Sequence, residues 1–246
     1  MEMSLSKNSI HIVTQAKGGV GKSFISRILI QYLREHMKVF CFDADPLNDG
    51  LVAFKGLEAH KLGLKMLNGN FDSRSYYDPL FETILLNDCC FLIDSGASTH
   101  INFISYLKGS DILNLFKEND REIIFHIPLS GSVDFNDCYK ELLKLSEMLP
   151  NNKIVIWENS FNGEVDISYR SEDKFKTMTN IQGIVELENL QAAPLLYDLE
   201  LMHKQNLIFS EVDANPSYFG AIIRRRLSLY KQSIYTQLDK VFNIQN

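Results

Sequence analysis

The sequence lacks a long hydrophobic segment and any cysteine arrangement typical of metal sites. Among its 246 residues, no apolar run approaches the roughly 20 residues that a membrane-spanning helix needs. The opening stretch MEMSLSKNS has no apolar core of the kind found in signal peptides. The four cysteines form no CxxC pair and no cluster with histidine at metal-ligand spacing. These absences predict a soluble, cytoplasmic protein whose cysteines are buried free thiols.

The sequence also has no large excess of charge of one sign. Its net charge is −6, with 23% charged and 45% hydrophobic residues, which is ordinary for a globular protein. This balance argues against nucleic-acid binding by the whole surface, although it leaves room for a local basic patch. Internal repeats and low-complexity linkers are absent too. We therefore treat residues 1–246 as a single domain, long enough to bury its own core.

Short apolar runs alternate with longer amphipathic segments. Strand-like runs cover residues 10–15, 39–43, 89–94, 122–129, 153–157 and 183–188, and helix-like patterns cover residues 22–36, 74–86, 102–117, 133–148, 193–204 and 218–242. Because the strands are nearly all apolar and helices separate them, we expect an α/β fold with a mostly parallel central sheet covered by helices on both faces. Residues 159–180 are rich in polar side chains and predict an irregular loop or small insertion.

A glycine-rich stretch, TQAKGGVGKS, lies between the first strand-like run and the first helix. Glycines there let backbone N–H groups approach phosphate oxygens, and the following helix directs its N-terminal dipole to the same place. Lys22 would neutralise the β- and γ-phosphates, and the Ser23 hydroxyl would bind Mg²⁺. The strict pattern G-x-x-x-x-G-K-[ST] is not met, because Ala16 stands at its first position. The predicted nucleotide-binding loop comprises Gly18, Gly19, Val20, Gly21, Lys22, Ser23 and Phe24.

Two apolar strands end in aspartate. VFCFDADP, residues 39–46, places Asp43 and Asp45 on alternate positions, so both would face the cleft at the carboxyl end of the sheet. A turn stabilised by aspartate and proline is the alternative interpretation. CCFLIDSGAS, residues 89–98, carries Asp94 to the same edge, where it can hold Mg²⁺.

The loop KGGVGKS, with Lys17 at its start, resembles the deviant Walker A loop of the ParA/MinD family of P-loop ATPases. The first glycine of the pattern is often replaced in that family. The resemblance implies a P-loop NTPase fold, ATP or ADP and Mg²⁺ as ligands, and a homodimer in the ATP-bound form. It also implies that Lys17 reaches across the dimer interface to the phosphates of the partner subunit. Such a lysine would stabilise transition-state charge only after association.

The resemblance also implies roles for the carboxylates. DADP is similar to the switch segment of the family, in which the second aspartate orients the attacking water and the first lies near the metal. The implied catalytic residues are Lys17, Lys22 and Asp45, and the implied metal ligands are Ser23, Asp43 and Asp94. Leu47 stands where the family often has glutamine, and a leucine side chain makes no polar contact there.

The stretch IWENSFNG, residues 156–163, resembles the place where the family puts an asparagine against the edge of adenine. The resemblance implies this role for Asn159, whose amide offers both a donor and an acceptor. A simple turn asparagine is the alternative.

Three stretches resemble one branch of the family, the TraL/StbB-type ATPases of conjugative and mobilisable elements: DSGAST, WENSFNG and FGAIIRRRLSLYKQSIYTQLD. The branch implies an ATPase switch that acts on the relaxosome or transfer machinery, or on DNA. A partition or stabilisation ATPase, and a nucleotide-gated adaptor with little hydrolysis, are the alternatives. We find no second substrate signature that would favour a metabolic kinase.

The last predicted helix has an apolar stripe and a basic face. The stripe consists of Ile223, Leu227, Tyr230, Ile234 and Leu238, and the basic face includes Arg224, Arg225, Arg226 and Lys231. One interpretation is a helix packed on the core with a solvated basic face. Another is non-specific DNA binding through the three arginines, which salt would weaken steeply. A membrane-surface helix is the third, but the segment ends polar and carries little charge there.

Overall fold

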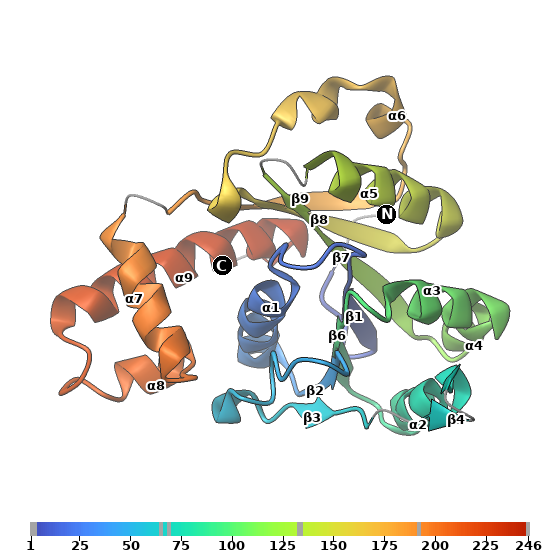
Figure 1. Ribbon diagram of the computed structural model, residues 1–246, viewed down its shortest axis with the longest axis horizontal. Helices are drawn as coiled ribbons and strands as arrows, with labels where there is room; N and C mark the ends of the chain where they lie inside the picture. The colour runs from blue at the N-terminus through green and yellow to red at the C-terminus, as the bar shows by residue number, and fades with distance from the viewer. Residues whose placement is uncertain (1–3, 64–65, 68–69, 132–134, 191–192, 245–246) are drawn as a thin grey trace.

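The computed structural model describes residues 4–63, 66–67, 70–131, 135–190 and 193–244, and it contains a seven-stranded sheet (Figure 1). The strand order is β3-β2-β6-β1-β7-β8-β9, and every neighbouring pair in this sheet is parallel. The strands are β1 (Ser9–Val13), β2 (Val39–Ala44), β3 (His60–Lys61), β6 (Cys90–Ser95), β7 (Glu122–Ser130), β8 (Lys153–Asn159) and β9 (Ile181–Leu187). A separate antiparallel pair joins β4 (Met66–Leu67) to β5 (Asn70–Phe71).

Helices cover both faces of the sheet. The helices are α1 (Lys22–His36), α2 (Ser73–Leu86), α3 (His100–Gly109), α4 (Ile112–Glu118), α5 (Phe135–Met148), α6 (Asp173–Lys176), α7 (Pro194–Lys204), α8 (Phe209–Asp213) and α9 (Ala221–Val241). Helices α1, α7, α8 and α9 share one hydrophobic core with the sheet, and α2, α3, α4 and α5 share the other. In β6, Cys90 and Leu92 belong to the first core, whereas Phe91 and Ile93 belong to the second. Burial on both faces explains why the inner strands of the sheet are largely apolar.

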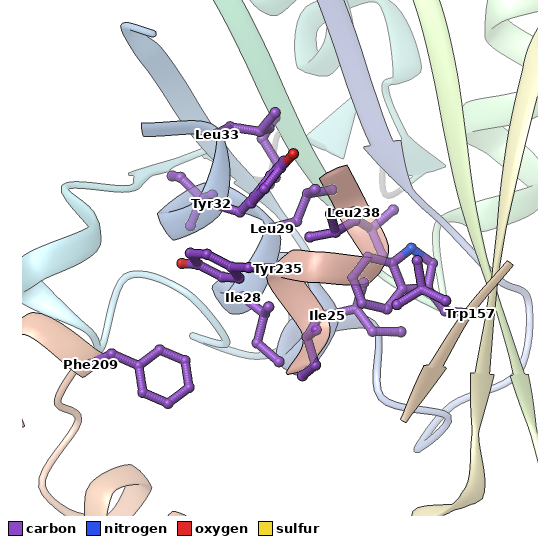
Figure 2. Packing of buried hydrophobic residues seen from close by; sticks show 14 of the residues in the cluster. Ile25, Ile28, Leu29, Tyr32, Leu33, Trp157, Phe209, Tyr235 and Leu238 are labelled. Carbon is purple, nitrogen blue, oxygen red and sulfur yellow. The ribbon is translucent and has the colours of Figure 1, made fainter. Parts of the chain in front are cut away.

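Helix α1 directly follows the glycine-rich loop, and its packing fixes where that loop ends. Its buried residues recur at helical spacing and face α9 and the sheet. Figure 2 shows Tyr235 and Leu238 of α9 beside Ile28 and Leu29 of α1. The rings of Tyr32 and Tyr235 meet edge to face, with centroids 5.1 Å apart. The long C-terminal helix therefore holds α1 in place behind the loop.

The structure confirms the α/β fold class and adjusts several boundaries. The helix expected over residues 102–117 is two helices, because Asp111 between them has a left-handed backbone with φ of 53°. The β9 strand begins at residue 181 rather than 183. Residues 133 and 134, the expected start of the next helix, lie outside the described residues. The β3 strand, the β4–β5 pair and α8 are too short for periodicity to predict.

The predicted irregular segment 159–180 contains 3₁₀ turns at Ser160–Asn162 and Ile167–Ser171 and the short helix α6. It packs against α5, because Tyr139 donates a hydrogen bond to Glu172 at 3.0 Å and the Tyr169 ring is fully buried beside Tyr139. All four cysteines are buried and free, as expected. Among the residues that the structure describes, none of the helices combines the length and the apolar character that a membrane crossing requires.

Candidate nucleotide-binding site

The glycine-rich loop connects β1 to α1 at the carboxyl edge of the sheet. Gly21 has a φ of +95°, and a Cβ atom there would lie 2.5 Å from Asn159 Nδ2, so both the backbone angle and the space call for glycine. Asn159, at the end of β8, donates from Nδ2 to the Val20 carbonyl at 3.0 Å and accepts at Oδ1 from Phe161 N at 3.1 Å. Asn159 thus braces the loop and stabilises its own turn. A contact with adenine would use its second amide hydrogen or the remaining lone pair of Oδ1, and it stays a prediction.

Lys22 is buried at the start of α1, and its side chain extends back along the glycine-rich loop. Its ammonium donates to the Lys17 carbonyl at 2.8 Å. Burial lowers the pKa of Lys22, and the nearby carboxylates of Asp94 and Asp45 oppose that shift. Three of the predicted site residues, Lys22, Asp45 and Asp94, are therefore close enough to interact electrostatically.

Asp94 and Ser23 lie side by side beneath the loop. Asp94 is buried and accepts a hydrogen bond from Ser26 Oγ at 2.8 Å. Burial raises the pKa of Asp94 to about 6, against hydrogen bonds from Ser23 and Ser26 that lower it. A Cβ atom on Gly50 would lie 2.6 Å from Ser23 Oγ and 3.7 Å from Asp94 Oδ2, which places the two side chains at one spot.

This spot fits a magnesium ion held partly by a nucleotide. Among the described residues, no group of three or more His, Cys, Asp or Glu side chains is arranged to hold a metal. Magnesium in phosphate sites typically needs only one or two protein oxygens, since phosphates and water supply the others. A buried carboxylate beside a hydroxyl, both next to the loop, meets that requirement. Ser23 and Asp94 are therefore the residues that would hold the ion.

Asp43 is fully buried at the end of β2, directly across from Asp94 in register. Its Oδ1 accepts from Asp45 N at 3.1 Å and its Oδ2 accepts from Leu51 N at 3.1 Å. Lys61 adds an ion pair at 3.4 Å. Because N–H donors already engage both oxygens, the arrangement favours loop anchoring over direct ligation of a metal by Asp43.

Asp45 is half-buried at the beginning of the loop that Asp43 anchors. Its carboxylate accepts from Leu47 N at 2.9 Å and from Asn48 Nδ2 at 3.1 Å. It also lies against the turn after β6, because a Cβ atom on Gly96 would be 2.9 Å from Asp45 Cγ. Asp45 therefore lies between the end of β2 and the turn that follows β6.

Lys17 lies at the rim of the site. Its ammonium is 3.6 Å from the Asp137 carboxylate at the start of α5, and its side chain is 41% exposed. The structure thus separates the two loop lysines: Lys22 is directed into the loop, and Lys17 toward its outer edge.

A cavity of about 240 Å³ opens beside the loop. Its walls include Gly19, Gly21, Phe24, Arg27, Asn159, Leu196, His203 and Tyr230. Four of these residues were predicted from the sequence: Gly19, Gly21, Phe24 and Asn159. Leu196 and His203 of α7 belong to no motif, and Tyr230 of α9 was assigned only to the apolar stripe of its helix. These residues reach the cavity through tertiary packing.

A buried hydrogen-bond chain behind the loop was also missed. Ser95 Oγ donates to Thr14 Oγ1 at 2.7 Å, Thr14 Oγ1 lies 2.8 Å from His100 Nδ1, and His100 Nε2 lies 2.9 Å from Glu141 Oε1. Burial lowers the pKa of His100, and Glu141 opposes this. These hydrogen bonds connect the segment that follows Asp94 to β1 and to α5. Its four residues, Thr14, Ser95, His100 and Glu141, are far apart in the sequence and follow no recognisable spacing.

Two of the three neighbouring arginines of α9 are engaged within the protein. Arg226 donates from Nη2 to the buried Asp198 at 2.9 Å, and Arg224 donates from Nε to the Phe219 carbonyl at 3.1 Å. Arg225 is exposed. These contacts favour the interpretation of α9 as a core helix, and they reduce the basic surface on which DNA binding would depend.

Comparison with known proteins defines the class to which this fold and site belong. The model of the CbiA family, described as the CobQ/CobB/MinD/ParA nucleotide binding domain, matches residues 11–213. The chain belongs to this family, which confirms the resemblance predicted from its loop.

Two curated relatives and two solved structures narrow the comparison. The chain is 28% identical to Protein TraL of Escherichia coli over 236 residues, which cover 94% of the chain and 97% of that protein. A second Protein TraL of Escherichia coli is 26% identical with the same coverage. The structure of an ATP complex of Cyanothece McdA has a TM-score of 0.51 at 15% identity, covering 98% of each chain. The signal recognition particle receptor FtsY of Elizabethkingia anophelis has a TM-score of 0.50 at 16% identity, covering 77% of this chain and 62% of that one. These two structures share the fold.

Proposed function

We propose that this protein is an ATP-dependent molecular switch that binds and slowly hydrolyses ATP. Support comes mainly from one observation: Lys22, Ser23, Asp94 and Asp45 gather around a single glycine-rich loop. Each group has a function in phosphoryl chemistry, and membership of the nucleotide-binding family supports the assignment.

The reaction would be in-line attack of water on the γ-phosphorus. The bond to the β–γ bridging oxygen breaks, and ADP and inorganic phosphate are released. Asp45 would orient the water, while Lys22 and the loop N–H groups stabilise negative charge on the phosphates. Bound Mg²⁺, held through Ser23 and Asp94, would neutralise phosphate charge. Asp45 accepts bonds from Leu47 and Asn48 in the structure, so it would have to rotate before it could orient water.

We further propose that the ATP-bound form is a homodimer. Lys17 lies at the rim of the site with an exposed side chain, where a second subunit could approach it. Lys17 would then complete the partner's site, and hydrolysis would release the pair. Turnover would be slow unless a partner protein stimulates it, because the catalytic arrangement depends on association.

We place the switch in conjugative transfer or mobilisation of a mobile element. Support comes from the similarity to Protein TraL, which extends over nearly the whole length of both chains. The partner would be a protein of the relaxosome or transfer machinery. A role in plasmid partition or stabilisation is the alternative within the same class.

The test is phosphate release by the wild type and by Lys22→Ala, each with Mg·ATP. We expect hydrolysis by the wild type to exceed that of the variant by at least about tenfold, because Lys22 would neutralise the charge that develops on the phosphates during hydrolysis. Equal rates, with DNA and candidate partners present, would rule out the ATPase. Tight ATP binding without hydrolysis would then identify the second candidate, a nucleotide-gated adaptor.

A further inference from the structure

The loop of residues 45–51 is tied down at both ends by one side chain. Asp43 accepts from the Asp45 amide and from the Leu51 amide, each at 3.1 Å. Asp43 is fully buried, and a buried carboxylate is costly unless donors or a cation compensate its charge. The loop therefore depends on whatever holds the Asp43 carboxylate in this orientation.

Lys61 supplies the compensating cation. It lies on the edge strand β3, directly opposite Asp43 in register. Its ammonium is 3.4 Å from Asp43 Oδ1 and 3.0 Å from Asp49 Oδ1, and it also donates to the Asn48 carbonyl. An ammonium has three hydrogens, so these three acceptors use its full donor capacity. One residue thus joins the anchor to the middle of the loop.

The same loop lies against the candidate catalytic groups. Gly50 approaches Ser23 so closely that a Cβ atom would be 2.6 Å from its hydroxyl. Asp45, at the other end, lies against the turn at Gly96. A movement of the loop would therefore change the surroundings of Ser23 and the position of Asp45 together.

We propose that Lys61 is a positioning residue, which fixes the loop of residues 45–51 through Asp43 and thereby places Asp45 for hydrolysis. The effect on hydrolysis rests on the proposed ATPase function, whereas the effect on the loop does not. Lys61 is absent from the loop motif and from both aspartate motifs, so its role emerges only from the pairing of β3 with β2.

The first test is hydrogen exchange of the peptide covering residues 44–52, in the wild type, Lys61→Met, Lys61→Gln and Lys61→Arg. Lys55→Met is the matched control, because Lys55 is an exposed lysine close by on the same segment of chain. We expect exchange to accelerate on the order of tenfold in Lys61→Met and Lys61→Gln, and to stay near the wild-type rate in the other two variants. Because Lys61 lies on an edge strand, peptides from β1 and β7 should exchange as in the wild type. Unchanged exchange of the loop peptide would overturn the proposal.

The second test is steady-state hydrolysis by the same variants. We expect Lys61→Met to lower kcat on the order of tenfold with KM for ATP changed less than about threefold, and Lys61→Arg to recover most of the rate. A purely structural residue would not produce this split together with rescue by arginine. If kcat is unchanged while the loop exchanges faster, the positioning role is refuted. If the wild type hydrolyses no more ATP than Lys22→Ala, the proposed ATPase fails, and the exchange result alone decides whether Lys61 fixes the loop.

Discussion

His11 and His126 are buried in the strands next to the glycine-rich loop, and we predict that they make the protein less stable in mild acid. Trp157 Nε1 donates to His126 Nδ1 at 3.0 Å, and His126 Nε2 lies 2.9 Å from His11 Nδ1. His11 Nε2 in turn lies 2.9 Å from Ser9 Oγ. Indole N–H only donates, so the chain is satisfied with both imidazoles neutral and each donating from Nε2. Together with Trp157, the two imidazole rings connect β1, β7 and β8 near the end of β1, where the glycine-rich loop begins.

The magnitude follows from the pKa of His11. Burial lowers this pKa from 6.5 to about 3, and burial also lowers the pKa of His126. Between pH 6.5 and 3 the unfolded chain binds a proton at His11 that the folded chain does not, so acid favours unfolding. Each pH unit in this window costs about 1.4 kcal/mol per group, or about 2 kcal/mol at pH 5 for His11 alone. Asp94, whose pKa is raised to about 6, acts in the opposite direction below that pH.

The assay is urea unfolding of the wild type and of His11→Gln at pH 7, 6.5, 6, 5.5 and 5. Because Asp94 and His126 are present in both proteins, and burial is the main cause of the lowered pKa of His126, the difference between the two slopes reports chiefly on His11. We expect the free energy of unfolding to fall more steeply with acid in the wild type, by about 1.4 kcal/mol per pH unit below pH 6. Parallel curves would refute the assignment of His11 as a buried neutral base.

Three further predictions concern single side chains. Lys17→Ala should bind ATP within about threefold of the wild type, yet hydrolyse it on the order of tenfold more slowly. Equilibrium binding and phosphate release measure the two effects. A large loss of ATP binding would contradict the proposal that Lys17 acts on the site of the partner subunit. Leu238→Ala should lower the free energy of unfolding by about 3 kcal/mol, since this fully buried side chain packs α9 against α1, and denaturant titration measures it. Arg226→Glu should lower the melting temperature more than Arg225→Glu, because only Arg226 pairs with the buried Asp198. Equal melting temperatures would show that the pair contributes nothing.

The sequence predicted those parts of the fold that depend on regular patterns. Helix α1 has the expected bounds, 22–36, because a glycine precedes it and its apolar spacing is unbroken. The longer strands inside the sheet were found because burial on both faces makes them largely apolar. The edge strand β9 is only partly buried, and its central Gly-Ile-Val run gave the signal. The two-residue strand β3 carries no such signal, and it exists because Asp43 and its neighbours pair with it.

The residues of the candidate site also fall into two groups, those that lie in sequence motifs and those that only tertiary packing brings to the site. Lys22, Ser23, Asp45 and Asp94 lie in motifs whose spacing reflects chemistry, and the structure brings them together. Lys61, His100 and Glu141 could not be predicted, since each reaches the site through tertiary packing. Asn159 stands out in the sequence for its place after a strand-like run. Its hydrogen bond to the Val20 carbonyl depends on how close β8 lies to the glycine-rich loop, which periodicity does not fix.

The most direct test of the proposed switch is sedimentation velocity of Asp45→Ala, a variant expected to bind ATP without hydrolysing it. With Mg·ATP at tens of micromolar protein, we predict a dimer, and with Mg·ADP a monomer. The double variant Lys17→Ala/Asp45→Ala should stay monomeric with either nucleotide. If Asp45→Ala binds Mg·ATP but remains monomeric, the nucleotide-driven pairing that defines the switch is contradicted.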